Sequence, residues 1–156
     1  MRTNRNKIRI LHVVGAMNRG GIETWLMHIL RNIDREHFQM DFLVHTTEPA
    51  AYDEEIRSLG SYVIPCNYTS QPLKYAFNLK QILYKYGSYD IVHSHVHHYS
   101  GYVLRIARNS DVRSRIAHSH NNTSSAEMGS SIYRRLYLSV TKLWINRYAT
   151  IGLACS

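Results

Sequence analysis

Apolar residues are spaced along this chain in two alternating patterns. Short runs rich in β-branched residues, of which Ile8 to Val14 is the first, are typical of buried strands. In the segment after that run, apolar residues recur at helical spacing at Ile22, Leu26, Ile29 and Ile33. The same alternation continues to the end of the chain, which predicts strands and helices in turn.

Six strands are expected, separated by five helices. We place the strands at residues 8–14, 40–45, 62–65, 90–93, 115–118 and 151–154, and the helices at 22–33, 51–59, 72–87, 99–108 and 132–148. Strict alternation predicts a doubly wound, Rossmann-like α/β fold: a parallel sheet of about six or more strands with helices on both faces. Ligands of such sheets bind beyond the carboxyl ends of the strands, so we expect functional side chains after the first, fourth and fifth strands.

The length of 156 residues suits one domain. The last expected strand, Ile151 to Ala154, has no helix after it. We therefore expect residues 1–156 to be one domain cut from a longer chain.

A glycine loop, Gly15-Ala16-Met17-Asn18-Arg19-Gly20-Gly21-Ile22-Glu23, joins the first strand to the first helix. Glycines let a ligand approach the backbone, and the free N–H groups at a helix N-terminus favour an anion such as phosphate. The loop lacks the Lys-Ser/Thr pair of a phosphate-loop NTPase and the G-x-G-x-x-G of a dinucleotide site. A plain strand-to-helix turn is the alternative interpretation.

The formal net charge of +8 favours anionic partners such as phosphates, acidic glycans or anionic lipids. Nucleic acid is not expected, because the basic residues are spread out and form no recognised nucleic-acid motif. Cys66 and Cys155 lie far apart and indicate no disulfide framework, which favours a reducing, cytoplasmic compartment. The sequence has neither a signal-peptide pattern nor an apolar run long enough to cross a bilayer.

Histidines lie at the end of the fourth expected strand and just after it, at His93, His95, His97 and His98. Alternate positions of a strand share one face, so the first three could bind zinc if the strand continued. The strand is expected to end near His95, and no Cys or carboxylate pattern completes a metal site. We therefore expect no metal. His93 is interpreted as a neutral core histidine, and the last two as solvated loop residues.

His120 follows the fifth expected strand and precedes Asn121. This position beyond a strand end is better suited to donating a hydrogen bond to a polar ligand than to packing in the core. His118, two residues earlier, leaves the same two alternatives open.

The long helix expected at residues 132–148 carries an apolar stripe and several cations. The stripe comprises Ile132, Leu136, Val140, Leu143 and Trp144, and the cations are Arg134, Arg135, Lys142 and Arg147. Such a helix can lie on an anionic membrane. Packing of the stripe against the core is the more common outcome, and it is what we expect.

Four segments in order resemble the N-terminal domain of glycosyltransferase family 4, and more narrowly the bacterial enzymes that assemble capsular polysaccharide or exopolysaccharide. They are Leu11 to Glu23, Tyr52 to Ile56, Asp90 to His95 and His118 to Asn121. The resemblance implies a GT-B fold, in which two Rossmann-like domains face each other across a cleft. It also implies retaining sugar transfer without a metal or other cofactor, from a nucleotide sugar linked to UDP or GDP.

The resemblance also assigns site residues. It places Gly20 and Gly21 near the donor diphosphate and the acceptor, and it matches His120, the expected catalytic residue, to the family histidine that contacts the transferred sugar. The other expected donor- or acceptor-binding residues are Glu23, His95 and Asn121. Arg19 matches no fixed family residue, and we include it because a cation there would suit a phosphate-bearing ligand. For Glu23, a favourable position near the positive end of a helix dipole is an equally good explanation.

The leading hypothesis is therefore the acceptor-side half of a retaining glycosyltransferase, inactive without its nucleotide-binding domain. Its partners would be a nucleotide sugar, a glycan or lipid-linked acceptor, and the inner face of the plasma membrane. A non-catalytic module that binds sugar phosphate or nucleotide beside a partner chain is the second hypothesis. A histidine-based metallohydrolase is the third, while the lack of a carboxylate pair argues against a glycosidase.

Overall fold

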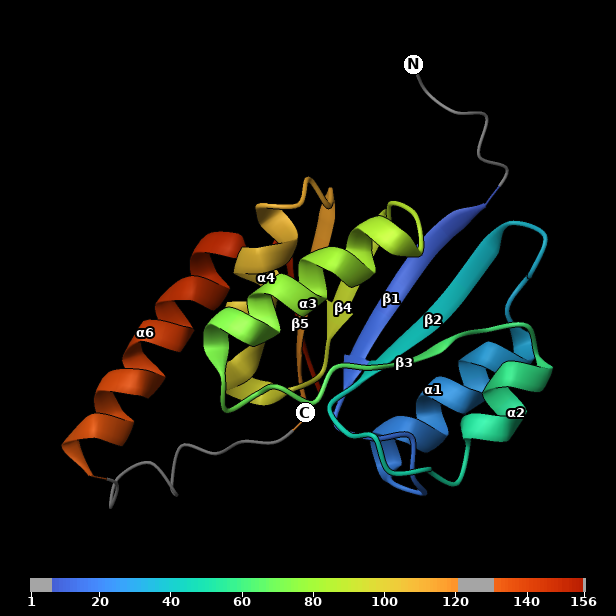
Figure 1. The fold of residues 1–156 in the computed structure, drawn as a ribbon, viewed down its shortest axis with the longest axis horizontal. Coiled ribbons are helices and arrows are strands. Elements are labelled where there is room, and N and C mark those ends of the chain that lie inside the picture. The colour runs from blue at the N-terminus through green and yellow to red at the C-terminus, as the bar shows by residue number, and fades with distance from the viewer. Residues whose placement is uncertain (1–6, 121–130, 156) are drawn as a thin grey trace.

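A six-stranded parallel sheet forms the centre of the computed structural model, which describes residues 7–120 and 131–155 (Figure 1). Its strands, in the spatial order β3-β2-β1-β4-β5-β6, are β1 (Ile8–Val14), β2 (Phe38–Val44), β3 (Val63–Pro65), β4 (Ile91–Ser94), β5 (Ser114–Ser119) and β6 (Ile151–Ala154). The order reverses between β1 and β4, which are neighbours in the sheet although β2 and β3 lie between them in the sequence. This topology confirms the predicted doubly wound α/β fold.

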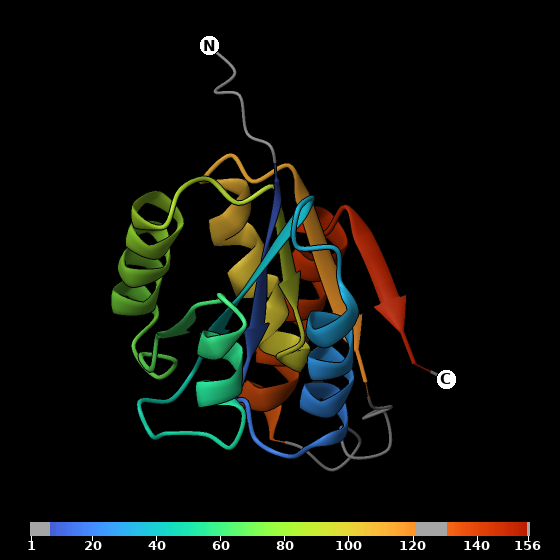
Figure 2. The ribbon, with the colours of Figure 1, turned by 90° about the vertical axis from the view of Figure 1, so that its right-hand side faces the viewer.

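Helices cover both faces of the sheet (Figure 2). They are α1 (Gly21–Asn32), α2 (Asp53–Ser58), α3 (Pro72–Lys85), α4 (Ser100–Arg108) and α6 (Ile132–Tyr148), with a short 3₁₀ helix η1 (His97–Tyr99) before α4. Proline at the first position of α3 starts that helix, and Gly87, with φ of 84°, follows its end. The predicted limits of strands and helices coincide with these or differ by at most two residues.

Alternation along β2 divides the apolar side chains between two cores. Phe42 and its neighbours on the same side of the strand pack with Leu26 and Leu30 of α1. Leu43 faces the other side, where it belongs to a core that includes Leu79 of α3 and Leu104 of α4. The sheet therefore has one face covered by α1 and α2 and another covered by α3 and α4.

Asp41 of β2 is a charged residue with no solvent exposure. Its Oδ2 accepts hydrogen bonds from the Arg9 guanidinium at 3.0 Å and from the Tyr89 hydroxyl at 2.9 Å. Its Oδ1 accepts from the Gln39 amide at 2.8 Å and from the Tyr62 backbone N–H at 3.0 Å. Four partners thus compensate the cost of burying this carboxylate, and they link β1, β2 and the residues just before β3 and β4.

Most of the apolar stripe of α6 does not pack against the core, so that prediction was wrong except at Trp144, whose ring stacks on Tyr102 of α4. Leu138 and Thr141 are the buried residues of α6, whereas Ile132, Leu136 and Leu143 are 77%, 65% and 63% exposed. The reason is a close approach to α4: a side chain at Gly101 would overlap the Thr141 carbonyl oxygen and lie 3.1 Å from the Trp144 Cβ. Because α6 contacts α4 through Thr141 and Trp144, most of the stripe faces outward.

Candidate functional site

The glycine loop lies where the strand order reverses, at the carboxyl edge of β1. Helix α1 begins at Gly21, and Gly20 occupies its N-cap position without a side-chain cap. The Glu23 carboxylate folds back over this turn, so a Cβ at Gly20 would overlap it, while a Cβ at Gly21 would meet no atom within 4 Å. The helix N-terminus is therefore open at Gly21 and covered by a carboxylate at Gly20.

A hollow of about 450 Å³ adjoins this helix N-terminus. It is lined by Gly21, Ile22, Glu23, Trp25, His120 and Cys155. Three residues that the sequence analysis selected, Gly21, Glu23 and His120, thus meet at one place although the last follows a different strand. Parallel strands cause this convergence, because their carboxyl ends share one edge of the sheet.

The other selected residues lie elsewhere. His95 is only 3% exposed and sits behind His120, with its Nδ1 2.9 Å from the His120 Nε2. Gly20 flanks the hollow without lining it, and Arg19 is exposed and also not among the lining residues. Asn121 lies outside the described residues.

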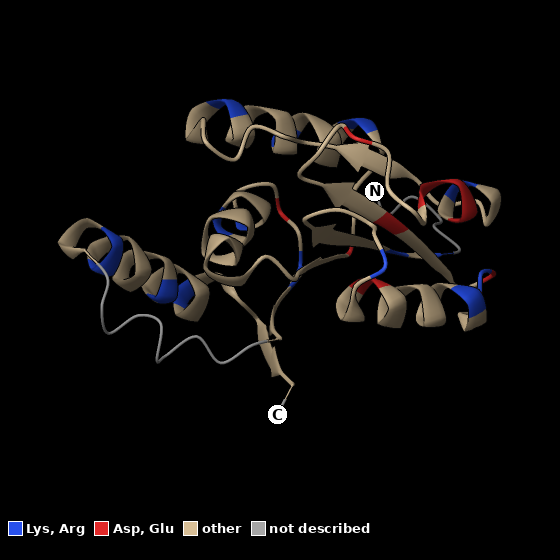
Figure 3. Ribbon diagram, turned by 90° about the horizontal axis from the view of Figure 1, so that it is seen from below, with Lys and Arg blue, Asp and Glu red and all other residues tan. Residues whose placement is uncertain are grey.

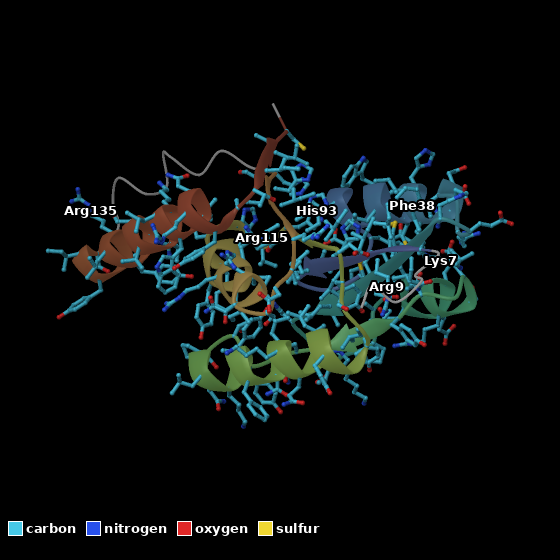
Figure 4. The ribbon with its side chains drawn as sticks, turned by 90° about the horizontal axis from the view of Figure 1, so that it is seen from above. Lys7, Arg9, Phe38, His93, Arg115 and Arg135 are labelled. Atoms are coloured by element: carbon cyan, nitrogen blue, oxygen red, sulfur yellow. The ribbon has the colours of Figure 1, made fainter. Side chains whose placement is uncertain are left out.

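Five histidines from three adjacent strands form what we call the histidine cluster. Its members are His12 of β1, His93 of β4, His95 just after β4, His118 of β5 and His120 just after β5. In Figure 4, His93 lies between helix α1 and the β6 side of the sheet. Strand register explains the contact between the rings of His12 and His93, since these are paired residues of β1 and β4. The indole ring of Trp25 in α1 packs edge-on against the cluster.

Two series of close contacts run through the cluster toward Cys155. In the first, the His12 Nδ1 lies 3.1 Å from the His95 Nε2, and the His95 Nδ1 lies 2.9 Å from the His120 Nε2. In the second, the His93 Nε2 lies 3.2 Å from the His118 Nδ1. The Cys155 Sγ ends both series, 3.4 Å from the His118 Nε2 and 3.6 Å from the His120 Nδ1.

Burial and mutual repulsion keep these imidazoles neutral. Burial is the main cause that lowers the pKa of His12 and His95 far below the usual histidine value, and neighbouring imidazoles add to it. Burial likewise lowers the pKa of His93 to about 4 and also lowers the pKa values of His118 and His120. Each neutral ring has one nitrogen that donates a hydrogen bond and one that accepts or binds a metal.

Sequence reasoning missed three members of this site: His12, Trp25 and Cys155. His12 stands within the apolar first strand, between Leu11 and Val13, and only its strand pairing shows its partners. His97, which the sequence placed on the same face as His93 if the strand continued, begins η1 with φ of 46° and is exposed. The turn at η1 ends the strand periodicity, as expected for a strand that stops near His95.

Acidification should destabilise the protein through His45, which follows β2. Burial lowers its pKa from 6.5 to about 4 in the folded state, and its Nε2 lies 2.8 Å from the Tyr75 hydroxyl. A depressed histidine pKa stabilises the fold above the unfolded value and loses that contribution as the pH falls from 6.5 toward 4. We expect His45→Gln to flatten the pH dependence of unfolding free energy by about 1 kcal/mol per pH unit in that window.

Urea denaturation of wild type and variant at several pH values measures this difference. His28→Gln, at an exposed position of α1, serves as the matched control and should leave the pH dependence unchanged. Equal pH dependence in wild type and His45→Gln would contradict the prediction.

Comparison with known proteins identifies relatives along almost the whole chain. The family model described as Glycosyltransferase Family 4 matches residues 19–154. The protein EpsF of Bacillus subtilis (strain 168) is 38% identical over 154 residues, which cover 97% of this chain and 40% of EpsF. The capsular polysaccharide biosynthesis glycosyltransferase CapH of Staphylococcus aureus is 31% identical over 92% of this chain and 39% of CapH. The chain thus spans about two fifths of the length of these two relatives.

Solved structures share the fold at low sequence identity. The O-GlcNAc transferase of Thermobaculum terrenum, in a mutant form, matches with a TM-score of 0.53 at 11% identity, over 75% of this chain and 24% of its own. The glucose dehydrogenase of Haloferax mediterranei matches with a TM-score of 0.50 at 6% identity, over 99% of this chain and 38% of its own. These likenesses show the Rossmann-like fold alone.

Among the described residues, no helix combines the length and the apolar character that crossing a bilayer requires.

Proposed function

The chain belongs to glycosyltransferase family 4, and from this premise we propose that it is the acceptor-side domain of a retaining sugar transferase. The enzyme would transfer a sugar from a UDP- or GDP-linked donor to a glycan or lipid-linked acceptor during bacterial polysaccharide assembly. The observation that carries this proposal is the hollow where the N-terminus of α1 meets His120 at the carboxyl edge of the sheet.

The geometry suits the chemistry of sugar transfer. As the bond to the leaving diphosphate breaks, positive charge develops at the anomeric carbon and negative charge on the phosphate. The free N–H groups of α1 at Gly21 favour the phosphate, and a neutral imidazole of His120 can donate a hydrogen bond to a sugar hydroxyl. No resident cofactor enters this proposal. Arg19 and Asn121 remain candidate contacts to the donor or acceptor.

The Glu23 carboxylate needs a defined role in this scheme, because it covers the helix N-terminus at Gly20. A negative side chain there stabilises the helix dipole when no ligand is bound. A donor diphosphate at this helix N-terminus would meet the same carboxylate, so we propose that Glu23 moves aside toward the acceptor when the donor binds.

Substitution of Gly21 tests the anion site. Because a Cβ at Gly21 meets nothing in the structure, we expect Gly21→Val to leave the fold intact while blocking close approach of the diphosphate. The expected result is at least a tenfold weaker donor affinity in the complete protein, measured by titration calorimetry with UDP and GDP sugars. Gly152→Val in β6, where a Cβ also meets no atom within 4 Å, is the matched control.

The outcome of that experiment also separates the alternatives. Donor binding that Gly21→Val leaves unchanged would reject this loop as the phosphate site. Binding without transfer to any glycan acceptor would favour the second hypothesis, a non-catalytic module acting with a partner chain. Because the proposed donor half is a separate domain, we expect residues 1–156 alone to transfer no sugar, and turnover by this chain alone would reject the two-domain proposal.

We further propose that α6 contacts the inner face of the plasma membrane, which would place the enzyme at the cytoplasmic surface. The exposed apolar stripe of α6 supports this, together with the cations that Figure 3 shows along the helix. The complete protein should co-sediment with phosphatidylglycerol vesicles and much less with phosphatidylcholine vesicles. Leu136→Asp should reduce this binding by at least fivefold, whereas Lys80→Glu on α3 should change it little; equal binding by Leu136→Asp would contradict the proposal.

A further inference from the structure

We propose that His95, His118 and His120, together with the thiolate of Cys155, bind a transition metal ion of the zinc class. One nitrogen from each of the three imidazoles lies within 4.8 Å of one from each of the other two. The Cys155 Sγ lies 3.4 Å from the His118 Nε2 and 3.6 Å from the His120 Nδ1. Imidazole and thiolate are the ligands that zinc prefers, and four of them satisfy its tetrahedral coordination.

The separations fit a metal once the His120 ring turns, because its Nε2 faces His95 while its Nδ1 faces Cys155. Zinc–nitrogen bonds of about 2.0–2.1 Å in a tetrahedron place two nitrogens about 3.3 Å apart. The His95 Nδ1 and the His120 Nε2 are 2.9 Å apart, close to that value. The corresponding nitrogen–sulfur separation is about 3.5 Å, since the zinc–sulfur bond is about 2.3 Å. The 3.4 Å from the Cys155 Sγ to the His118 Nε2 agrees with it, whereas the 3.6 Å contact joins the Cys155 Sγ to the His120 Nδ1, the nitrogen that does not face His95.

The remaining two histidines provide the outer partners that metal-binding imidazoles require. A ligating imidazole usually donates its other N–H to a second group, which fixes its orientation. The His12 Nδ1 is 3.1 Å from the His95 Nε2, which leaves the Nδ1 of His95 for the metal. The His93 Nε2 is 3.2 Å from the His118 Nδ1, which leaves the Nε2 of His118 for the metal. The whole histidine cluster is thereby accounted for as an inner and an outer layer.

The surroundings favour a metal site at the outer edge of the cluster, beside His120 and Cys155, over one in its interior. His120 and Cys155 line the hollow beside α1, which gives an ion a route from solvent. Cys155 would bind the ion as a thiolate, and Glu23, which lines the same hollow, adds a second negative charge that balances the charge of the ion. His12, His93 and His95 also form a possible triad, but all three are buried and no anionic ligand stands among them in the described structure. Nitrogen and sulfur ligands disfavour Mg²⁺ and Ca²⁺, which require oxygen.

No metal was expected from the sequence, because no Cys or carboxylate pattern along the chain completes a metal site. Strand pairing changes this expectation, since it brings ligands from positions 95, 118, 120 and 155 together. The metal site does not depend on the proposed transfer activity. If both hold, the metal and a donor sugar compete for His120, so an occupied metal site would be an inhibited state.

Cobalt substitution tests the site directly. The untagged chain, first treated with a chelator, is titrated with Co²⁺ while its visible absorption is recorded. We expect one equivalent to produce the intense bands of tetrahedral coordination together with a thiolate-to-cobalt charge-transfer band, and Zn²⁺ to abolish both by displacement. The weak spectrum of octahedral Co²⁺, or the absence of saturation at one equivalent, would overturn the proposal.

Variants then assign the ligands. Cys155→Ser should remove the charge-transfer band and weaken Zn²⁺ binding by at least tenfold, and His118→Ala should weaken it similarly; circular dichroism checks that each variant is folded. His28→Ala and Cys66→Ser are the matched controls outside the site and should bind Zn²⁺ as the wild type does. Wild-type affinity in Cys155→Ser would remove the thiolate from the proposed site and overturn it as stated. These readouts involve no sugar transfer, so their failure would leave the proposed function untouched.

Discussion

Replacing His120 with Ala in the complete enzyme should lower its turnover by about 10²-fold or more while leaving the fold intact. The size follows from loss of one preorganised hydrogen-bond donor to a transition state, which typically costs that much. The ring lies at the wall of the hollow beside α1, and the His95 Nδ1 is 2.9 Å from its Nε2, which orients it. His120→Asn should retain part of the activity, because the amide can still donate a hydrogen bond.

Turnover, donor affinity and thermal stability should be measured together for this variant. Chelator is added to every assay so that metal bound at the histidine cluster does not enter the comparison. His28→Ala provides the control, since His28 is exposed on α1. Near-normal turnover of His120→Ala, or a loss matched by unfolding of the variant, would return His120 to a structural role.

Replacing Asp41 with Ala should destabilise the protein by about 3 to 5 kcal/mol, the usual loss when one partner of a buried ion pair is removed. The Asp41 carboxylate is fully buried and accepts hydrogen bonds from Arg9, Gln39, Tyr62 and Tyr89. Its removal leaves the Arg9 guanidinium without its 3.0 Å ion-pair partner and takes an acceptor from three neutral donors, of which the Gln39 amide still donates to the Gly60 carbonyl.

Urea denaturation at neutral pH measures the loss, and Glu36→Ala at an exposed position is the control. The control should change the unfolding free energy by less than about 0.5 kcal/mol, as surface substitutions usually do. A loss below about 1 kcal/mol in Asp41→Ala would show that water or a rearranged side chain replaces the carboxylate. A variant too unstable to purify is examined as Asp41→Asn, which keeps the oxygen that accepts from the Tyr62 backbone.

Much of the fold could be predicted, because patterns of nearby residues indicate where its strands and helices lie. The β-branched run at Ile8–Val14 and the helical spacing after Gly21 identify a strand and a helix without any long-range information. The sequence also placed the glycine loop and His120 beyond strand ends, and the structure brings both to one hollow. Their roles in sugar transfer remain predictions.

The orientation of α6 could not be predicted in the same way. Its apolar stripe has the spacing of a core-facing helix, yet Leu136 and Leu143 are exposed. Periodicity shows that a helix has an apolar side, but not what that side meets. The line of contact is set by Gly101 of α4, whose missing side chain lets the backbone of α6 approach near Thr141. This contact depends on residues of two separate helices, so the periodicity of α6 alone does not show it.

By itself, the sequence determined the alternation of strands and helices, the parallel doubly wound sheet and the loops at its carboxyl edge, because each depends on short-range periodicity and on general rules of chain connection. Only the tertiary structure decided that five histidines from three strands form one cluster ending at Cys155. The physical reason is strand pairing: the register of β1, β4, β5 and β6 places side chains together that are up to 143 positions apart in the sequence, from His12 to Cys155.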